Sequence, residues 1–224
     1  MGVVRTVVRY PLVVLGRLGR HINRRRDLKF DAKFGIETER FDIGPAASME
    51  HMGPYAATPT RFFGRIIRAT GIDPGQFAFI DLGSGKGRTL LLASDQGFKS
   101  VIGVEFDEAL CAVAQANIDR ATIGQGARPT VVQADARHAE LPEGNLFVFM
   151  FNPFSGPIFD DVADRLAVAA REPRPVIVAY NNDKCGDVLE RTGTFRRIRL
   201  KPLKFWTPPS MSIFYNDIAW RMRC

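Results

Sequence analysis

The sequence is poor in the residues from which disulfide frameworks and metal centres are built. Its 224 residues include only three cysteines and three histidines. An odd number of dispersed cysteines indicates neither a disulfide framework nor a metal site, so we expect no metal and a reducing compartment such as the cytoplasm. Each histidine is expected at the surface or at a helix cap. The six residues are Cys111, Cys185, Cys224, His21, His51 and His138.

Acidic residues are missing from the first 26 residues, which we call the basic N-terminal arm. Residues 1–26 contain seven arginines, a number equal to the net charge of +7, so residues 27–224 carry no net charge. Within that remainder, residues 196–224 are basic and residues 27–195 are acidic. A basic edge beside an acidic body can guide a charged macromolecule or be only a solvated face. A nucleic-acid partner is therefore considered but not favoured.

The arm also lacks an apolar run long enough to span a membrane. Its longest uncharged stretch, Tyr10 to Gly16, is far below the roughly twenty residues of a spanning helix, and Pro11 would kink a helix there. Apolar residues nevertheless recur at three- and four-residue steps, which is typical of a helix on an anionic membrane surface. These residues are Val4, Val8, Leu12, Leu15, Leu18 and Ile22.

Other interpretations of the arm stay open. A helix with one apolar side can instead pack on the domain and cover a cleft. An arginine-rich start without acids also resembles a mitochondrial presequence, although a cleaved signal peptide would need a longer apolar core. The opening Met-Gly-Val-Val-Arg-Thr fits the pattern for N-myristoylation. Peripheral membrane association, or a mitochondrial location in a eukaryote, is thus one expected outcome.

A turn with three closely spaced glycines carries the most specific chemical information. Residues 81–87 read Asp-Leu-Gly-Ser-Gly-Lys-Gly, directly after the apolar run 77–80 and before a helical pattern from Arg88. Glycine permits positive φ and lets the backbone approach a ligand, so this arrangement predicts a nucleoside-binding turn. A dinucleotide site would have its third glycine one residue later, and an ordinary strand-to-helix turn is the plain alternative.

With its leading acid, the turn resembles motif I of class I S-adenosylmethionine (SAM) methyltransferases, Asp/Glu-x-Gly-x-Gly-x-Gly. The resemblance implies SAM as the cofactor, and a carboxylate suits the positively charged sulfonium and amino groups of its methionine end. The resemblance covers roughly residues 30–220. Over this range the sequence is similar to a mostly unassigned bacterial group of these enzymes and, more distantly, to seven-strand protein-lysine methyltransferases. The cofactor-binding residues that it implies in this turn are Asp81, Gly83, Ser84, Gly85 and Gly87.

Further expected cofactor contacts lie outside the glycine turn. Glu105 ends the next predicted strand about twenty residues on, where a ribose-binding acid sits in such folds; a solvated strand end is the alternative. Asp135 follows the third strand, where the family places an acid that receives the adenine amino group, and it is equally suited to be a helix N-cap. The resemblance also places Tyr55 and Thr58 in a lid over SAM, against the alternative of a surface turn.

The fourth predicted strand runs into Asn152-Pro153-Phe154-Ser155, where the methyl acceptor is expected. Amine-directed methyltransferases often carry Asn/Asp-Pro-Pro-Tyr/Phe there, and the resemblance implies that Asn152 orients an amine while Phe154 packs on the acceptor. This sequence has one proline where that motif has two, and Asn-Pro can also simply initiate a turn. No general base is evident, although Tyr180 after the fifth strand could serve.

Apolar periodicity predicts an α/β fold: a Rossmann-like doubly wound sheet of seven strands with a C-terminal antiparallel hairpin and an N-terminal helical extension. Residues 27–60 are expected to form loops rather than regular elements. Predicted helices are 60–70, 86–96, 107–122, 158–170 and 183–192, and predicted strands are 77–81, 100–105, 130–134, 146–151, 175–180, 194–201 and 211–220. The expected division is the arm (1–26), a cap or lid segment (27–71) and a methyltransferase domain (72–224).

These features predict a SAM-dependent methyltransferase that acts on a nitrogen nucleophile, with a protein lysine or N-terminal amine ahead of a nucleic-acid base or a small-molecule amine. Because the sulfonium is already activated, such an enzyme needs mainly alignment of its reactants in a dry site. The absence of metal-ligand spacing argues against methyl transfer assisted by a divalent ion. A non-catalytic SAM-binding regulator, tethered by its basic arm, is the alternative of another class.

Overall fold

The structure is a computed structural model that describes residues 24–39, 56–124, 126–201 and 210–223. Residues 1–23 of the basic arm and the predicted lid residue Tyr55 lie outside the described residues. Residues 24–34 are helical, which corrects the expectation that residues 27–60 contain only loops. The helix was missed because its buried side combines two acids, Asp27 and Asp31, with Phe34 and therefore forms no continuous apolar stripe.

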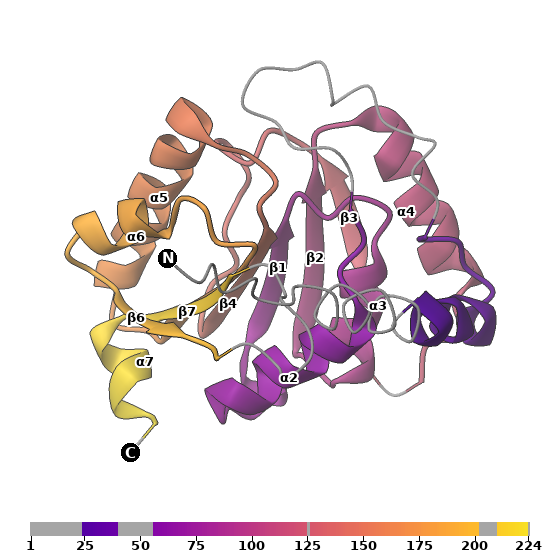
Figure 1. Ribbon diagram of the computed structural model, residues 1–224, viewed down its shortest axis with the longest axis horizontal. Coiled ribbons are helices and arrows are strands. Elements are labelled where there is room, and N and C mark those ends of the chain that lie inside the picture. The colour runs from indigo at the N-terminus through magenta and orange to yellow at the C-terminus, as the bar shows by residue number, and fades with distance from the viewer. Residues whose placement is uncertain (1–23, 40–55, 125, 202–209, 224) are drawn as a thin grey trace, which may run out of the picture.

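Seven strands form one sheet in the order β3-β2-β1-β4-β5-β7-β6, and helices surround it (Figure 1). Strands β1 to β5 pair in parallel, whereas β7 is antiparallel to both β5 and β6. This arrangement confirms the predicted α/β class and the closing antiparallel hairpin. The strands are β1 (Ala78–Leu82), β2 (Ser100–Glu105), β3 (Thr130–Gln133), β4 (Leu146–Phe151), β5 (Val176–Asn181), β6 (Arg196–Arg199) and β7 (Met211–Tyr215).

Five helices, α2 to α6, lie close to their predicted ranges because each carries an apolar side that the sheet or a neighbouring helix buries, whereas η2 and α7 were not predicted. These elements are α2 (Thr60–Thr70), the short 3-10 helix η2 (Pro74–Gln76), α3 (Arg88–Asp95), α4 (Glu108–Arg120), α5 (Gly156–Arg171), α6 (Gly186–Arg191) and α7 (Asp217–Arg221). Among the described residues, no helix is both long and apolar enough to cross a membrane.

The central strands are buried on both faces, as expected for a parallel sheet covered by helices. In β4, Phe147 and Phe149 join the core cluster that contains α2 residues, while Val148 and Met150 join the cluster that contains α5 residues. The same alternation in β1 directs Phe79 and Ile80 to opposite faces.

The C-terminal strand is shorter than predicted. Residues 211–220 were expected to be one strand, but β7 ends at Tyr215 and α7 begins at Asp217. Asn216 causes the change: its side-chain oxygen accepts hydrogen bonds from Ala219 N (2.9 Å) and Val176 N (3.1 Å). An asparagine that caps a helix stops the strand, and the apolar residues beyond it had concealed that signal.

Candidate active site

The glycine turn and the Asn152–Ser155 segment lie at the carboxyl edge of the parallel strands, where β1 and β4 are neighbours. The chain proceeds from β1 to β2 and β3 on one side and from β4 to β5 on the other, so the connections diverge between β1 and β4. Open α/β sheets bind their ligands at such a switch point. The loops that follow these two strands are residues 83–87, the glycine turn, and residues 152–155, the acceptor loop.

Glycine is required in the glycine turn for backbone conformation and, at its first position, for contact with the acceptor loop. The φ angles are 86° at Gly83, 54° at Gly85 and 81° at Gly87. Residues with a side chain rarely adopt such positive values. A Cβ atom added to Gly83 would lie 2.4 Å from Cβ of Pro153. The two loops therefore touch at Gly83 and Pro153, and this contact gives Gly83 a structural reason beyond close approach to a ligand.

Asp81 is a buried carboxylate with one oxygen unpaired. It lies in β1 and is 2% exposed. Its Oδ2 atom accepts a hydrogen bond from the Thr89 hydroxyl, whereas Oδ1 is buried with no hydrogen-bond partner among the described residues. Burial raises the pKa of Asp81 well above its usual range, and Glu105 nearby adds to the shift. Asp81 is thus a site for a positively charged or hydrogen-donating group.

Glu105 ends β2 and faces the glycine turn. Its Oε2 atom accepts a hydrogen bond from Gly85 N (2.7 Å), and Oε1 accepts from Phe106 N (2.9 Å) and Asp107 N (3.0 Å). The residue is buried, and burial raises its pKa from the usual value while these three bonds oppose the shift. The alternative of a solvated strand end is therefore wrong for Glu105.

Asp135 is held by a neighbouring arginine rather than by a helix. Its carboxylate accepts hydrogen bonds from Arg137 N (2.8 Å) and Arg137 Nε (3.0 Å). These bonds lower the pKa of Asp135. Residues 136–138 form a turn, so the interpretation of Asp135 as a helix N-cap is wrong, because a local turn satisfies the carboxylate instead.

Asn152 and Tyr180 are brought together although 28 residues separate them in sequence. The Tyr180 hydroxyl donates to Oδ1 of Asn152 at 3.2 Å. Asn152 has a positive φ of 45°, a conformation that asparagine tolerates better than most residues and that occurs often at functional sites. Tyr180 lies inside β5 rather than after it, and it is fully buried.

The aromatic residues of the acceptor side belong to the core. Tyr180 stacks on Phe159 of α5 with ring centroids 5.2 Å apart, and Phe154 lies 6.1 Å from the same ring. Phe154 is only 5% exposed. Burial raises the pKa of Tyr180 above its usual value, which disfavours the phenolate that a general base would need. Tyr180 is thus suited to orient Asn152 as a neutral donor.

Two predicted cofactor residues are buried. The Ser84 side chain lies against β2, because a Cβ atom added to Gly103 would be 2.7 Å from Ser84 Oγ. Thr58 is 3% exposed, so the alternative of a surface turn does not describe it.

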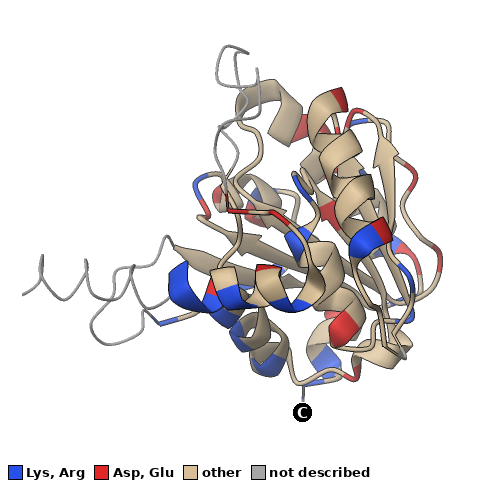
Figure 2. Cartoon of the chain, turned by 90° about the vertical axis from the view of Figure 1, so that its right-hand side faces the viewer, with Lys and Arg blue, Asp and Glu red and all other residues tan. Residues whose placement is uncertain are grey.

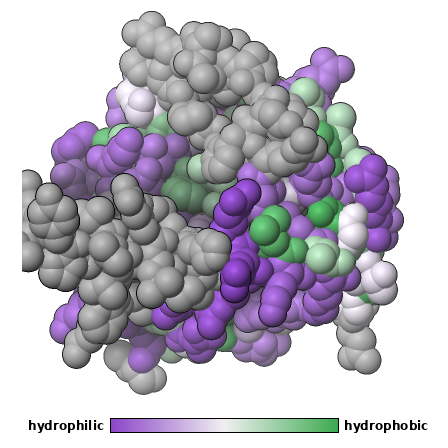
Figure 3. Space-filling model, turned by 45° about the vertical axis from the view of Figure 1, so that its right-hand side comes forward, coloured by the Kyte–Doolittle hydropathy of each residue, from purple (hydrophilic) through white to green (hydrophobic). Residues whose placement is uncertain are grey.

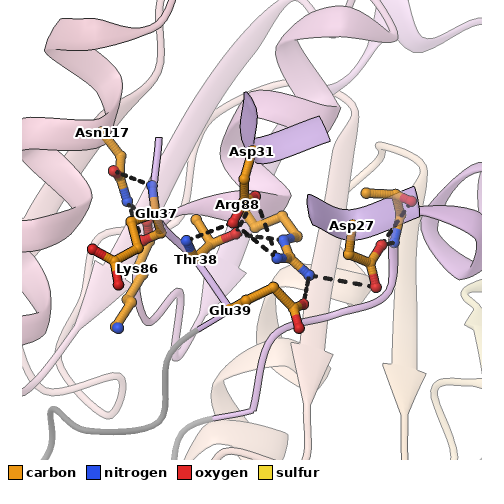
Figure 4. A network of polar contacts seen from close by, with 9 residues as sticks. Asp27, Asp31, Glu37, Thr38, Glu39, Lys86, Arg88 and Asn117 are labelled. Atoms are coloured by element: carbon orange, nitrogen blue, oxygen red, sulfur yellow. Dashed lines mark hydrogen bonds and ion pairs between the residues drawn. The ribbon is translucent and has the colours of Figure 1, made fainter. Parts of the chain in front are cut away.

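The sequence did not indicate the polar cluster beside the glycine turn. Arg88 is buried in α3 and contacts Asp27, Asp31, Thr38 and Glu39, which precede it by about fifty residues or more (Figure 4). The signal was present only in part, because the family resemblance over roughly residues 30–220 includes both Asp31–Thr38 and Arg88. The contact of Arg88 with Asp31 and Thr38 could not be predicted from the sequence of either segment.

Phe106 was also missed by the sequence analysis. Its side chain follows Glu105 directly and is 43% exposed, which is unusual for an aromatic residue next to a buried acid.

In the part of the chain that the structure describes, no group of three or more metal-ligating side chains occurs.

The comparisons with known proteins agree with this geometry. Residues 79–171 match the family model described as a methyltransferase domain. Structures with a similar fold include a SAM-dependent methyltransferase from Aquifex aeolicus, with 17% identity, a TM-score of 0.52 and coverage of 71% of this chain and 93% of that one. Another is the ribosomal protein L11 methylase from Lactobacillus delbrueckii subsp. bulgaricus, with 14% identity, a TM-score of 0.50 and coverage of 74% and 82%.

At these identities the structural likeness shows the fold alone, and no curated protein sequence matches the chain. The family match spans β1 to α5, and thus includes the glycine turn, Glu105 and the acceptor loop. Residues 79–171 thus match a methyltransferase domain, and the described residues have a seven-stranded fold similar to structures that include a SAM-dependent methyltransferase.

Proposed function

We propose that the ends of β1 and β2, together with the glycine turn that follows β1, hold SAM through Asp81 and Glu105. The observation that carries this proposal is the buried Asp81 Oδ1 atom without a partner among the described residues. An unpaired buried carboxylate oxygen is costly, and the ammonium group of SAM would supply the missing positive partner. The residues present therefore fit this cofactor.

The charge of the site also favours SAM over a dinucleotide. Asp81 and Glu105 are both acids, they interact electrostatically, and burial raises the pKa of each. A pyrophosphate would bring negative charge toward them, whereas SAM carries positive charge. In this proposal Glu105 accepts hydrogen bonds from the ribose hydroxyls, Asp135 receives the adenine amino group, and the exposed ring of Phe106 packs on the adenine.

We propose that Asn152 orients a nitrogen nucleophile at the acceptor loop. Its Oδ1 atom is fixed by the Tyr180 hydroxyl, and its loop touches the glycine turn through Pro153 and Gly83. An amide oxygen held at this position can accept a hydrogen bond from an amine and so direct its lone pair. The buried Phe154 would shape the wall of the site rather than cover the acceptor.

When bound, SAM supplies a methyl group on an activated sulfonium. The chain's own residues then need to align the nucleophile and exclude water. The acceptor loop contains no ionisable side chain, and the raised pKa of Tyr180 keeps that hydroxyl neutral. We therefore assign loss of the amine proton to solvent, while a backbone carbonyl of the loop accepts a hydrogen bond from the amine.

An asparagine substitution tests the acceptor site. We expect Asn152→Ala to lower the methyl-transfer rate about a hundredfold while SAM affinity changes by no more than a few-fold, because misalignment acts on the transition state. Asn182→Ala is a matched control, since Asn182 also follows a central strand and has a φ of 54°. Wild-type turnover in Asn152→Ala would show that Asn-Pro is only a turn.

The acceptor itself is tested by transfer of labelled methyl from SAM into a cell extract. The resemblance to lysine methyltransferases favours a protein amine, so we expect label in the protein fraction, on lysine side chains or N-terminal amines. Label in the nucleic-acid or small-molecule fraction would assign the alternative acceptors. Tight SAM binding without transfer into any fraction would instead support a non-catalytic regulator.

We also propose that the arm lies on an anionic membrane surface, and the described helix at residues 24–34, which includes the last three residues of the arm, supports this proposal. Residues 24–34 expose all their basic side chains and bury their two acids, so the exposed side of this helix is basic. Figure 2 colours its lysine and arginine positions blue. Leu28 of this helix is 45% exposed. On the visible part of the face in Figure 3, hydrophobic areas are small and separate. Attraction of the protein to a membrane would therefore be mainly electrostatic. The basic residues are Arg24, Arg25, Arg26, Lys29 and Lys33.

Vesicle sedimentation tests the membrane proposal. The full chain should bind vesicles that contain anionic lipid and dissociate as salt rises, because each surface arginine contributes about 1 kcal/mol and is screened within a Debye length. Deletion of residues 1–26, which removes all seven arginines of the arm, should remove most of this binding. If deletion instead lowers the melting temperature or SAM affinity, and neither form binds vesicles, the arm packs on the domain.

A further inference from the structure

The N-terminal segment, defined here as residues 24–39, is tied to the glycine turn by an arginine that the proposed chemistry does not use. Arg88 directly follows Gly87 as the first residue of α3 and is 2% exposed. Its guanidinium forms ion pairs with Asp31 at 3.3 Å, Glu39 at 2.8 Å and Asp27 at 3.7 Å (Figure 4). Three acids of one segment thus share one buried cation.

The hydrogen bonds around Arg88 fix the geometry of this cluster. Arg88 Nε donates to the Thr38 hydroxyl at 2.6 Å, and that hydroxyl donates to Asp31 at 2.7 Å. Thr38 N also donates to Asp31, at 2.8 Å. Because a guanidinium is planar and presents its donors in a fixed fork, the positions of Asp31 and Thr38 depend on where α3 begins.

A second bridge runs from the same segment to the glycine turn through α4. Asn117 exchanges two hydrogen bonds with the backbone of Glu37, both at 3.1 Å, and its Nδ2 atom also donates to the carbonyl oxygen of Lys86 at 3.0 Å. Lys86 is the residue before Gly87. The segment is therefore bound to the backbone of the turn as well as to the first side chain after it.

Apolar packing completes the attachment of the segment. Phe34 and Ile36 form a small core cluster with Leu91 of α3 and Ala121 at the end of α4. Asp27 in addition accepts hydrogen bonds from Thr60 N (2.9 Å) and the Thr60 hydroxyl (2.8 Å) at the start of α2. The segment thus touches the helices on both sides of the turn.

We infer that Arg88 is a positioning residue that couples docking of the N-terminal segment to SAM binding. The inference rests on the proposed SAM site in the glycine turn. Residues 86–88 supply both the end of that turn and the groups that hold the segment, so one backbone geometry serves both. Coupling between two such events is reciprocal: SAM, by selecting this geometry, favours the docked segment, and the docked segment favours SAM.

The test compares two arginines that differ in burial. Arg88→Lys keeps the charge but loses the fork, and we expect SAM affinity to fall about tenfold, within the usual range of coupling between sites. Arg128→Lys is the control, because Arg128 pairs with Asp119 at the surface and its side chain is 59% exposed. Affinity is measured by calorimetry at a temperature where circular dichroism shows each variant to be folded.

Hydrogen exchange of residues 24–39 supplies a readout that a merely structural role would not change. In the wild type, saturating SAM should slow exchange in this segment, and in Arg88→Lys this SAM-dependent protection should largely disappear. Asn117→Ala removes the second bridge and replaces Arg88→Lys if that variant does not fold; it should show the same two effects at smaller size.

The outcomes separate this inference from the proposed cofactor site. If the wild type does not bind SAM, the proposed site fails. If the wild type binds SAM and both Arg88→Lys and Asn117→Ala keep its affinity and its SAM-dependent protection, the inference is overturned, even where their melting temperatures fall. Loss of affinity together with loss of protection, and no change in Arg128→Lys, supports it.

Discussion

The glycine turn and the acceptor loop meet at the switch point of the sheet, yet they are built from different interactions. Next to the glycine turn lie two buried carboxylates, Asp81 and Glu105, and burial raises the pKa of each. The acceptor loop contains no ionisable side chain, and a neutral hydrogen bond from Tyr180 holds its asparagine. Charge is therefore concentrated where a cationic cofactor would bind, whereas shape and a fixed amide define the neighbouring place for the acceptor.

This difference suits methyl transfer. A negative site stabilises the positive charge of SAM before the reaction, whereas a neutral acceptor site does not favour the protonated, unreactive form of an amine. If the two loops have these separate duties, substitutions in one should change cofactor affinity and substitutions in the other should change rate. Only their point of contact should affect both.

The largest expected effect is at that point of contact. In Gly83→Ala, the new Cβ atom would lie 2.4 Å from Pro153 and φ is 86°, so we expect about 3 kcal/mol of destabilisation and about a hundredfold loss in both SAM affinity and transfer rate. Gly97→Ala is the control, since Gly97 has a φ of 82° and nothing within 4 Å. Gly97→Ala should lower the free energy of unfolding by about 1 kcal/mol, measured with denaturant, and leave SAM affinity and the transfer rate unchanged. Equal costs for the two variants would exclude the close contact of the loops.

A smaller effect is expected on the charged side. Glu105→Gln removes the negative charge of the carboxylate that accepts a hydrogen bond from Gly85 N. A charge-assisted hydrogen bond contributes about 1.5–3 kcal/mol, so its loss should weaken SAM binding at least tenfold. Glu108→Gln, an exposed residue of α4, should not change the affinity. Calorimetry that finds NADH bound more tightly than SAM would contradict the assignment of this side to SAM.

The comparison also predicts a pH dependence. Because the pKa of Asp81 is raised, the carboxylate gains a proton as pH falls through that raised value, and SAM affinity should then fall several-fold. Stability has the opposite sign: an acid with a raised folded pKa stabilises fully below its unfolded pKa of about 4 and loses this contribution as pH rises through the folded value. Calorimetry and thermal unfolding from pH 5 to 8 should show both trends weakened in Asp81→Asn. An unchanged pH profile in that variant would contradict the role of Asp81.

The smallest effect is expected from Tyr180→Phe. This change removes one neutral hydrogen bond to Asn152, worth about 1 kcal/mol, so the transfer rate should fall only about fivefold. Its pH profile should match that of the wild type, because the raised pKa of Tyr180 keeps the hydroxyl protonated. A loss of a thousandfold, or of one limb of the pH profile, would show instead that Tyr180 is a general base.

Most of the fold could be predicted from local patterns. The ranges of α2, β2 and β4 agree with the sequence prediction, because helix and strand periods are properties of neighbouring residues. The helix at 24–34 escaped because two of its buried positions are acids whose partner, Arg88, lies far away in sequence. The roles of the site residues and the three-part division of the chain stay predictions.

The sequence by itself determined the α/β class, the glycine turn and the chemistry available at the end of each strand. These depend on residue order within short segments, where spacing alone fixes which side chains share a face or a turn. Tertiary structure decided which segments meet: Gly83 with Pro153, Tyr180 with Asn152, and Arg88 with Asp31. The physical reason is that contacts between residues tens of positions apart depend on strand order and on the packing of helices against the sheet, which no local pattern contains.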